Sequence, residues 1–261
     1  MSRHIIRDAW RHLTAMTPAR IALGRAGASL PTDEVLRFGL AHAQARDAVH
    51  TPFEADALAQ EIEALGFATL RVATGAPDRA TYLRRPDYGR KLAPESRTML
   101  EGARGDPVDL VLLVADGLSS TAIHTQAARF LAAFKIWIER EKWRLAPVVI
   151  AHQGRVALGD EVGELLRGRL VAVLIGERPG LSSPDSLGIY LTYGPRVGRT
   201  DAERNCISNI RDGGLAHDLA AFKLAWLARE GLKRQLTGVN LKDESDLLPA
   251  GDDRTALPGV R

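Results

Sequence analysis

Short apolar segments that alternate with helix-like segments constrain the fold of this chain more than any other feature. VDLVLLVAD (108–116), APVVIAH (146–152) and LVAVLIG (170–176) have the length and composition of strands that are buried on both faces. Residues 119–142 and 160–167, which separate them, carry apolar side chains at helical spacing. The alternation predicts an α/β fold with a Rossmann-like, mostly parallel sheet and flanking helices.

The surrounding segments predict further elements and a smaller region before this domain. In chain order we expect first a helix over 1–15, with Ile5, Ile6, Ala9, Trp10 and Leu13 on one side, and an extended connector over 17–31. Thr32 then caps a helix that ends before Pro52 and carries the apolar stripe Val35, Leu36, Leu40 and Ala43. We further expect a helix over 54–65, a strand over 67–74, a short helix over 94–103, a candidate fifth strand over 189–193 and a last helix over 216–237. Residues 75–93 show no clear pattern. We therefore expect a helical N-terminal region with an extended connector (1–65), followed by a Rossmann-like domain (66–261).

The composition restricts the compartment and the partners. No apolar run approaches the roughly 20 residues of a membrane-spanning helix, and the N-terminus lacks the apolar core of a signal peptide. The single cysteine, Cys206, excludes an internal disulfide and fits a reducing compartment, so we expect a cytoplasmic protein that does not bind membranes. The net charge of +3 would suit an anionic partner, but a solvated surface explains it equally well, and we expect no nucleic-acid binding.

Polar turns that contain glycine follow three of the expected strands. They are Asp116-Gly117-Leu118-Ser119, His152-Gln153-Gly154 and Gly176-Glu177-Arg178-Pro179-Gly180. In such sheets ligands bind outside the carboxyl ends of the strands, although Gly and Asp also occur there simply as turn residues. The chain has no G-x-G-x-x-G, P-loop or G-x-S-x-G motif, and its seven histidines do not pair with Cys or acidic residues at zinc-ligand spacing. We expect a ligand crevice but assign no catalytic residue and no metal site.

Two residues near the expected crevice have specific chemistry. Glu177 directly follows a buried strand, and its carboxylate accepts hydrogen bonds, which suits a ligand with N–H donors. An intrachain ion pair with Arg178 or Arg199 would explain this residue equally well. Cys206 falls in or beside a loop before the last helix. A lone cysteine is more often a small buried hydrophobe than a reactive group, and no histidine lies near it in sequence.

Several longer motifs together resemble one known family. LIGERPGLSSPDSLGIYLTYGPRVGRTDAERNCISNIR, TPARIALGRAGASLPT and VADGLSS are similar, in order and spacing, to the small (light) subunit of ethanolamine ammonia-lyase. The likeness runs from about Thr17 to Asp243. A motif as long as GERPGLSSPDSLG followed by NCISNI is far more specific than a short fingerprint.

The resemblance implies a subunit of an adenosylcobalamin-dependent lyase that converts ethanolamine to acetaldehyde and ammonia by a radical mechanism. In such a hetero-oligomer the large subunit binds ethanolamine, and the small subunit closes over the cofactor. The family's cobalamin contacts fall on Val156 in GRVALGD, Glu177 in GERPG and Cys206 in NCISN. The chain lacks D-x-H-x-x-G, the motif whose histidine replaces the cofactor's base on cobalt. The adenosylcobalamin should therefore be base-on, with its own dimethylbenzimidazole as a cobalt ligand.

Two other interpretations stay open. The crevice could serve a stand-alone α/β enzyme with a small anionic substrate, or the chain could be an assembly subunit that never touches a cofactor. The resemblance, in contrast, implies a chain that is inactive without its large subunit. Because related enzymes are housed in bacterial microcompartments, it also leaves open whether the host encloses this protein in one. Residues 1–15 resemble an encapsulation tag, and we expect activity to survive their deletion.

Overall fold

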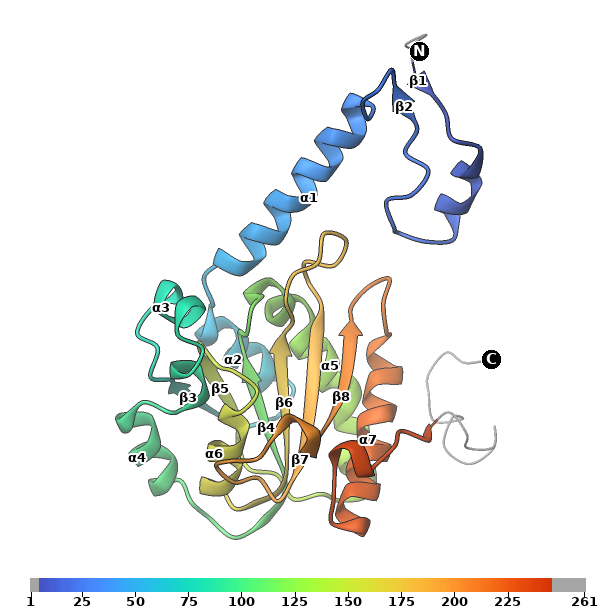
Figure 1. The fold of residues 1–261 in the computed structure, drawn as a ribbon. Coiled ribbons are helices and arrows are strands. Elements are labelled where there is room, and N and C mark those ends of the chain that lie inside the picture. Colours follow the sequence, from blue (N-terminus) through green and yellow to red (C-terminus); the bar gives the residue numbers. More distant parts are fainter. Residues whose placement is uncertain (1–4, 246–261) are drawn as a thin grey trace.

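A six-stranded sheet forms the centre of the computed structural model, which describes residues 5–245 (Figure 1). Its strands are β3 (Thr69–Ala73), β4 (Val108–Ala115), β5 (Val148–His152), β6 (Gly168–Gly176), β7 (Leu187–Tyr193) and β8 (Arg204–Ile210). They lie in the order β3-β5-β4-β6-β7-β8. The first four are parallel, whereas β7 pairs antiparallel with both β6 and β8.

The sheet is buried on both faces because successive side chains of its central strands enter two different cores. Leu110, Leu112 and Val114 of β4 belong to the first core, and Val111 and Leu113 to the second. Strands β4, β5 and β6 accordingly consist almost entirely of buried apolar residues. This is the composition expected of parallel strands covered on both sides.

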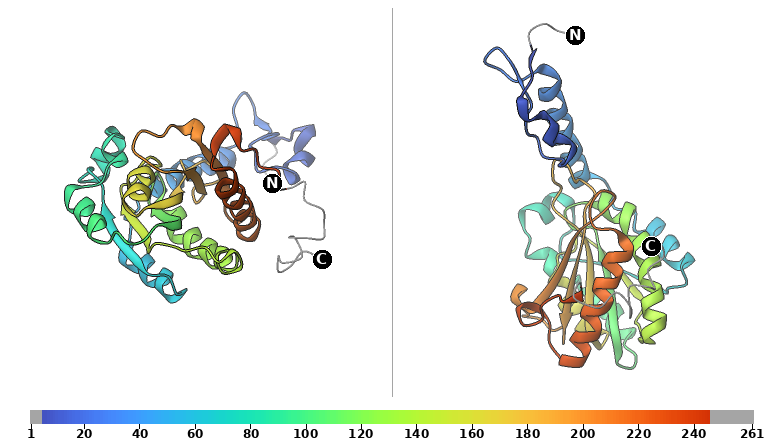
Figure 2. Two further views of the ribbon diagram at one scale, coloured as in Figure 1. Left: turned by 90° about the horizontal axis from the view of Figure 1, so that it is seen from below. Right: turned by 90° about the vertical axis from the view of Figure 1, so that its right-hand side faces the viewer.

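Helices cover both faces of the sheet (Figures 1 and 2). α2 (Ala55–Ala64), α5 (Ser120–Glu141) and α7 (His217–Arg234) pack on the first core, whereas α4 (Pro94–Gly102) and α6 (Leu158–Leu165) pack on the second. The remaining helical elements of the body are α3 (Arg79–Arg84) and the 3₁₀ turns η2 (Tyr88–Arg90), η3 (Asp201–Glu203) and η4 (Gly238–Asn240).

The predicted α/β class, with a mostly parallel sheet and flanking helices, is confirmed. The strand order differs from the 3-2-1-4-5-6 order of the dinucleotide-binding fold, and two antiparallel strands complete the sheet. The prediction that Cys206 lies in or beside a loop is wrong, because this residue lies within β8. The unassigned segment 75–93 contains α3 and η2.

An arm projects from the body (Figures 1 and 2). It consists of β1 (Ile5–Ile6), the 3₁₀ helix η1 (Ala9–Ala15), β2 (Arg25–Ala26) and α1 (Thr32–His50), with β1 antiparallel to β2. The helix expected over 1–15 is found only in part within the described residues 5–15: Ala9–Ala15 forms a 3₁₀ helix, and Ile5–Ile6 forms a strand instead. No residue of η1 is buried, and Trp10 is 65% exposed, so the apolar face that suggested an α-helix has no core to pack on.

The predicted apolar stripe of α1 also lies outside any core of this chain. Val35, Leu36 and Leu40 are exposed, and the buried residues of this helix are Ala41 and Ala48. Residues 1–4 and 246–261, the ends of the two expected domains, lie outside the described residues. The domain boundary expected between 65 and 66 stays a prediction, although α2, on its N-terminal side, packs on the first core.

Candidate functional site

A crevice opens at the carboxyl ends of the central parallel strands. The helix after β4 packs on the first core and the helix after β5 on the second, so the two connecting loops diverge. The cavity between them has a volume of about 450 Å³. It is lined by Tyr82, Gly117, Leu118, Arg155, Val156, Ile175, Gly176, Glu177, Arg178 and Tyr190. The crevice therefore lies at the strand ends, where the polar turns predicted it.

The floor of the crevice requires a glycine at position 117. Gly117 has a φ of +56°, and a Cβ atom there would lie 2.3 Å from the carbonyl oxygen of Gly176. The same oxygen accepts a hydrogen bond of 2.9 Å from the Leu118 N–H. The loop after β4 is thus held tightly against the end of β6.

Asp116 is part of the support for this floor rather than of its surface. Its side chain is buried, with Oδ1 accepting from the Gly154 N–H at 3.2 Å and Oδ2 lying 3.2 Å from Nη1 of Arg79. Burial raises the pKa of Asp116 to about 6, and the Arg79 guanidinium opposes this rise. Asp116 therefore ties the end of β4 to the turn after β5.

Glu177 projects into the crevice from the end of β6 with one carboxylate oxygen fixed and the other free. Oε2 accepts hydrogen bonds from the Ser186 hydroxyl at 2.5 Å and from the Asn209 N–H at 3.2 Å. Oε1 receives no hydrogen bond from any described residue. The alternative of an ion pair is wrong for the described residues, since neither Arg178 nor Arg199 forms one with Glu177 and Arg199 pairs with Glu203 instead.

The loop that begins at Glu177 is anchored along its length. The Glu177 N–H donates to the Ser186 carbonyl at 2.9 Å, which closes its base. From the start of α5, the Ser119 hydroxyl donates to the Pro184 carbonyl at 2.7 Å. At its far end the Leu181 carbonyl accepts from Nη2 of Arg20, in the arm, at 3.1 Å. The sheet, α5 and the arm together position this loop.

The three residues expected to contact cofactor lie around Tyr190. Val156, in the loop after β5, and Glu177, after β6, line the crevice together with Tyr190. Cys206 does not line it, but it lies directly opposite Tyr190 in the pairing of β7 with β8. The thiol is exposed, not buried as the alternative interpretation required. Even so, the surrounding protein desolvates it enough to raise the pKa of Cys206, while a hydrogen bond with Tyr190 opposes the rise.

Sequence reasoning missed three residues of the crevice. Tyr82 lies in the unassigned segment 75–93, and Arg155 directly precedes Val156. Tyr190 could have been found by continuing the β6–β7 hairpin: it lies opposite Val173, on the side of the sheet that carries the second core. Arg155 lies within GRVALGD and Tyr190 within the long motif that begins LIGERPG, so both were within reach of the resemblance, whereas Tyr82 belongs to neither motif.

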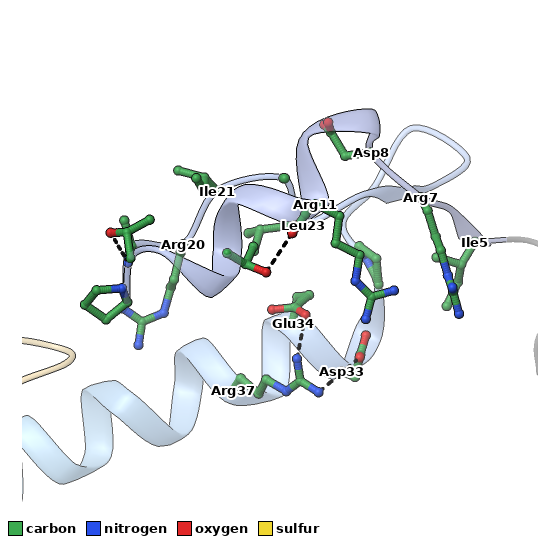
Figure 3. A pocket seen from close by; sticks show the side chains of 16 residues that line it. Ile5, Arg7, Asp8, Arg11, Arg20, Ile21, Leu23, Asp33, Glu34 and Arg37 are labelled. Atoms are coloured by element: carbon green, nitrogen blue, oxygen red, sulfur yellow. Dashed lines mark hydrogen bonds and ion pairs between the residues drawn. The ribbon is translucent and has the colours of Figure 1, made fainter. Parts of the chain in front are cut away.

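A second cavity, of about 540 Å³, lies within the arm between η1, the connector and the first turns of α1 (Figure 3). Arg7, Arg11 and Arg37 line it together with Asp33 and Glu34, and Nη1 of Arg37 donates to Glu34 at 2.7 Å. None of Val156, Glu177 and Cys206 lines this cavity. It is separate from the crevice.

Residues 5–245 contain neither a metal-binding cluster nor a helix that could span a membrane. No group of three or more His, Cys, Asp or Glu side chains there is arranged to hold a metal ion. In the same part of the chain, no helix is both long and apolar enough to cross a membrane.

Comparisons with known proteins agree on one family. The family model for the ethanolamine ammonia-lyase light chain (EutC) matches residues 7–242. A protein named ethanolamine ammonia-lyase small subunit from Xanthomonas campestris pv. campestris (strain ATCC 33913) is 56% identical over 258 residues, which cover 98% of this chain and 95% of that protein. A protein of the same name from Pseudomonas fluorescens (strain Pf0-1) is 54% identical over 241 residues, 91% and 88% of the two chains. This chain belongs to the ethanolamine ammonia-lyase light-chain, or small-subunit, family.

Proposed function

We propose that this chain is the small subunit of an adenosylcobalamin-dependent ethanolamine ammonia-lyase, and that it closes over the cofactor while the large subunit holds ethanolamine. One observation carries the proposal in this family member: Val156, Glu177 and Tyr190 line one crevice, and Cys206 lies opposite Tyr190 on the neighbouring strand. These three residues are the proposed cofactor contacts.

The side chains around the crevice suit a corrin ring with amide arms. Such a ring offers apolar methyl groups together with carboxamides, whose N–H groups donate and whose carbonyls accept. Oε1 of Glu177 is a free acceptor, Arg178 supplies N–H donors, and Val156 and Tyr190 supply apolar surface.

The residues of this chain would bind and orient the cofactor rather than react. When bound, adenosylcobalamin supplies the radical chemistry of the lyase. Glu177 accepts from a carboxamide N–H, and its Ser186 and Asn209 bonds keep the carboxylate in place. None of the described residues that line the crevice is a histidine, which supports a base-on cofactor with its own dimethylbenzimidazole on cobalt.

We assign docking of the large subunit to the exposed apolar face of α1. Leu36 is 68% exposed, and Val35 and Leu40 lie exposed on the same helix. Such a face is costly in water, and the large subunit is the partner that membership of the family supplies. Leu36→Glu should weaken association with the large subunit, whereas deletion of residues 1–15 should leave turnover within about twofold.

Reconstitution tests the proposal. The chain and its large subunit are purified separately and together, and ethanolamine deamination is measured with added adenosylcobalamin. We expect activity only from the complex and none from either subunit by itself, because this chain belongs to a family named for one subunit of the enzyme. Deamination by the isolated chain would contradict the proposal. We infer that the complex works in the cytoplasm, including the interior of a microcompartment in hosts that build one.

A further inference from the structure

Arg155 is a cation without an anion at the edge of the crevice. Arg97, Arg199 and Arg204 nearby pair with Glu161, Glu203 and Asp160. Arg178 and Arg90 form no ion pair with a described residue, but Arg155 alone among these unpaired arginines has a buried donor atom without a partner. Among the described residues no carboxylate lies within 4 Å of the Arg155 guanidinium, and its Nε is buried with no hydrogen-bond partner. An unpaired donor and charge in such a place cost free energy unless a ligand completes them.

The Arg155 side chain is held in place for such a ligand. Its Cζ lies 4.1 Å from the centre of the Tyr82 ring, and its Nη2 donates to the Tyr82 carbonyl at 3.3 Å. Tyr82 is itself fully buried, with its hydroxyl donating to the Gly154 carbonyl at 2.9 Å. Gly89 closes over this pair so tightly that a Cβ atom there would lie 2.8 Å from the Tyr82 ring. The guanidinium is therefore pre-positioned at little further entropic cost.

Arg155 also joins the crevice to a third cavity, which is basic and separate from the cavity in the arm. This cavity has a volume of about 460 Å³ and shares Arg155, Val156 and Tyr190 with the crevice. Arg90 adds an exposed cation to its wall. Asp201 is the carboxylate among its lining residues, and it lies 3.4 Å from Arg204. A ligand that fills the crevice thus has a positively charged extension beside it.

We propose that Arg155 binds the phosphodiester of the cofactor's nucleotide loop, which would lie in this basic cavity while the corrin ring occupies the crevice. The inference rests on the proposed function. The corrin arms of base-on adenosylcobalamin are neutral carboxamides, whereas the phosphodiester carries a negative charge. An arginine fork matches two phosphate oxygens, and charge-assisted bonds of this kind are stronger than those to an amide. Nη1 and the N–H of Nη2 that is not donated to Tyr82 would contact the two phosphate oxygens.

The test compares ligands with and without the phosphate. Dissociation constants of the reconstituted complex are measured by titration with three ligands. They are adenosylcobalamin, adenosylcobinamide, which lacks the phosphate, ribose and base, and adenosylcobinamide phosphate, which keeps the phosphate as a monoester and lacks the ribose and base. Arg155→Gln should weaken the two phosphate-bearing ligands by about 10- to 100-fold and leave adenosylcobinamide unchanged. Arg155→Lys should recover part of the loss, since it keeps the charge but not the fork. Arg196→Gln, an equal charge change at an exposed site outside both cavities, is the matched control.

Several outcomes would overturn the inference and leave the proposed function intact. Equal weakening of all three ligands would make Arg155 a support of the crevice, and no weakening would make it irrelevant to the cofactor. Weakening of adenosylcobalamin alone would assign Arg155 to the ribose or the base. Loss of subunit assembly in Arg155→Gln would assign it to a carboxylate of the large subunit. If the wild-type complex bound none of the ligands, the proposed function itself would fail.

Discussion

Gly188 of β7 lies against the carboxylate of Glu177: a Cβ atom on Gly188 would lie 2.8 Å from Oε1 and 3.0 Å from Cγ. The two residues are brought together by the β6–β7 hairpin, in which Gly188 pairs with Ile175. The absence of a side chain at position 188 gives the carboxylate room on the face that lines the crevice. The position of Oε1 of Glu177 in the crevice therefore requires a glycine at position 188.

Glu177→Gln should weaken cobalamin binding by the reconstituted complex by about 1 to 3 kcal/mol, the range for losing a hydrogen bond to a charged acceptor. The fold should survive, because Glu177 lies on a half-buried rim. Titration monitored by the cofactor's absorbance measures the effect. Glu95→Gln, at an exposed site on α4, is the control and should change nothing. An unchanged affinity in Glu177→Gln would reduce Glu177 to a structural role.

A double-mutant cycle with Gly188→Ala tests the geometry behind this effect. The added methyl group should displace the carboxylate and weaken cofactor binding in the wild-type background. The same change should cost less in the Glu177→Gln background, where the charged acceptor is already lost. Gly102→Ala, where a Cβ meets no atom within 4 Å, is the control. Strictly additive losses would show that Gly188 acts independently of Glu177.

The buried pair of Asp160 and Arg204 should contribute strongly to stability. Their side chains are 3% and 2% exposed, and two contacts of 2.7 Å join them. Asp160→Ala leaves the Arg204 charge buried without its partner and should lower the free energy of unfolding by about 3 to 5 kcal/mol. Chemical denaturation measures this. Glu34→Ala, which breaks a pair with the exposed Arg37, should cost less than about 1 kcal/mol. Similar losses in both variants would contradict the argument.

Asp116 should make stability depend on pH in an identifiable direction. Its pKa is about 6 in the folded chain and near the ordinary 3.8 when unfolded, so the folded state binds more protons between pH 4 and 6. The free energy of unfolding should therefore fall as pH rises through this window, by up to about 3 kcal/mol, and Asp116→Asn should lack this component. Lowered pKa values of His124, His152 and His217 act in the opposite direction, so the measured quantity is the difference between wild type and variant. Parallel pH profiles would contradict the prediction.

The sequence predicted the fold where one periodicity dominates. Apolar runs such as 170–176 have the length of a buried strand and are short for a helix, and the structure has β6 over Gly168–Gly176. The predictions of two elements were wrong, for different reasons. RNCISNI alternates weakly and follows a loop-rich stretch, so the strand β8 was missed. Residues 5–15 have an apolar face, but without a core in this chain that face does not produce an α-helix.

The sequence predicted where in the fold the candidate site lies, but not which side chains contact one another there. Glu177 follows a buried strand, and that position alone places it at the sheet's carboxyl edge. That Tyr190 pairs with Cys206 depends on the register of β7 with β8, which is irregular between Leu187 and Ile189. The support of Arg155 by Tyr82 joins residues 73 positions apart. Long-range pairings of this kind leave no local pattern.

Cys206 offers a direct probe of the proposed cofactor site, because it is the chain's single cysteine and its thiol is exposed. Alkylation with iodoacetamide at pH 7 should be slower than that of free cysteine and should accelerate as pH rises, since desolvation raises the pKa of Cys206 and the thiolate is the reactive form. In the complex with the large subunit, saturating adenosylcobalamin should slow labelling further by covering the thiol, and ethanolamine alone should not. Cys206→Ser gives the background. Labelling at an undiminished rate with cofactor bound would place Cys206 outside the contact surface.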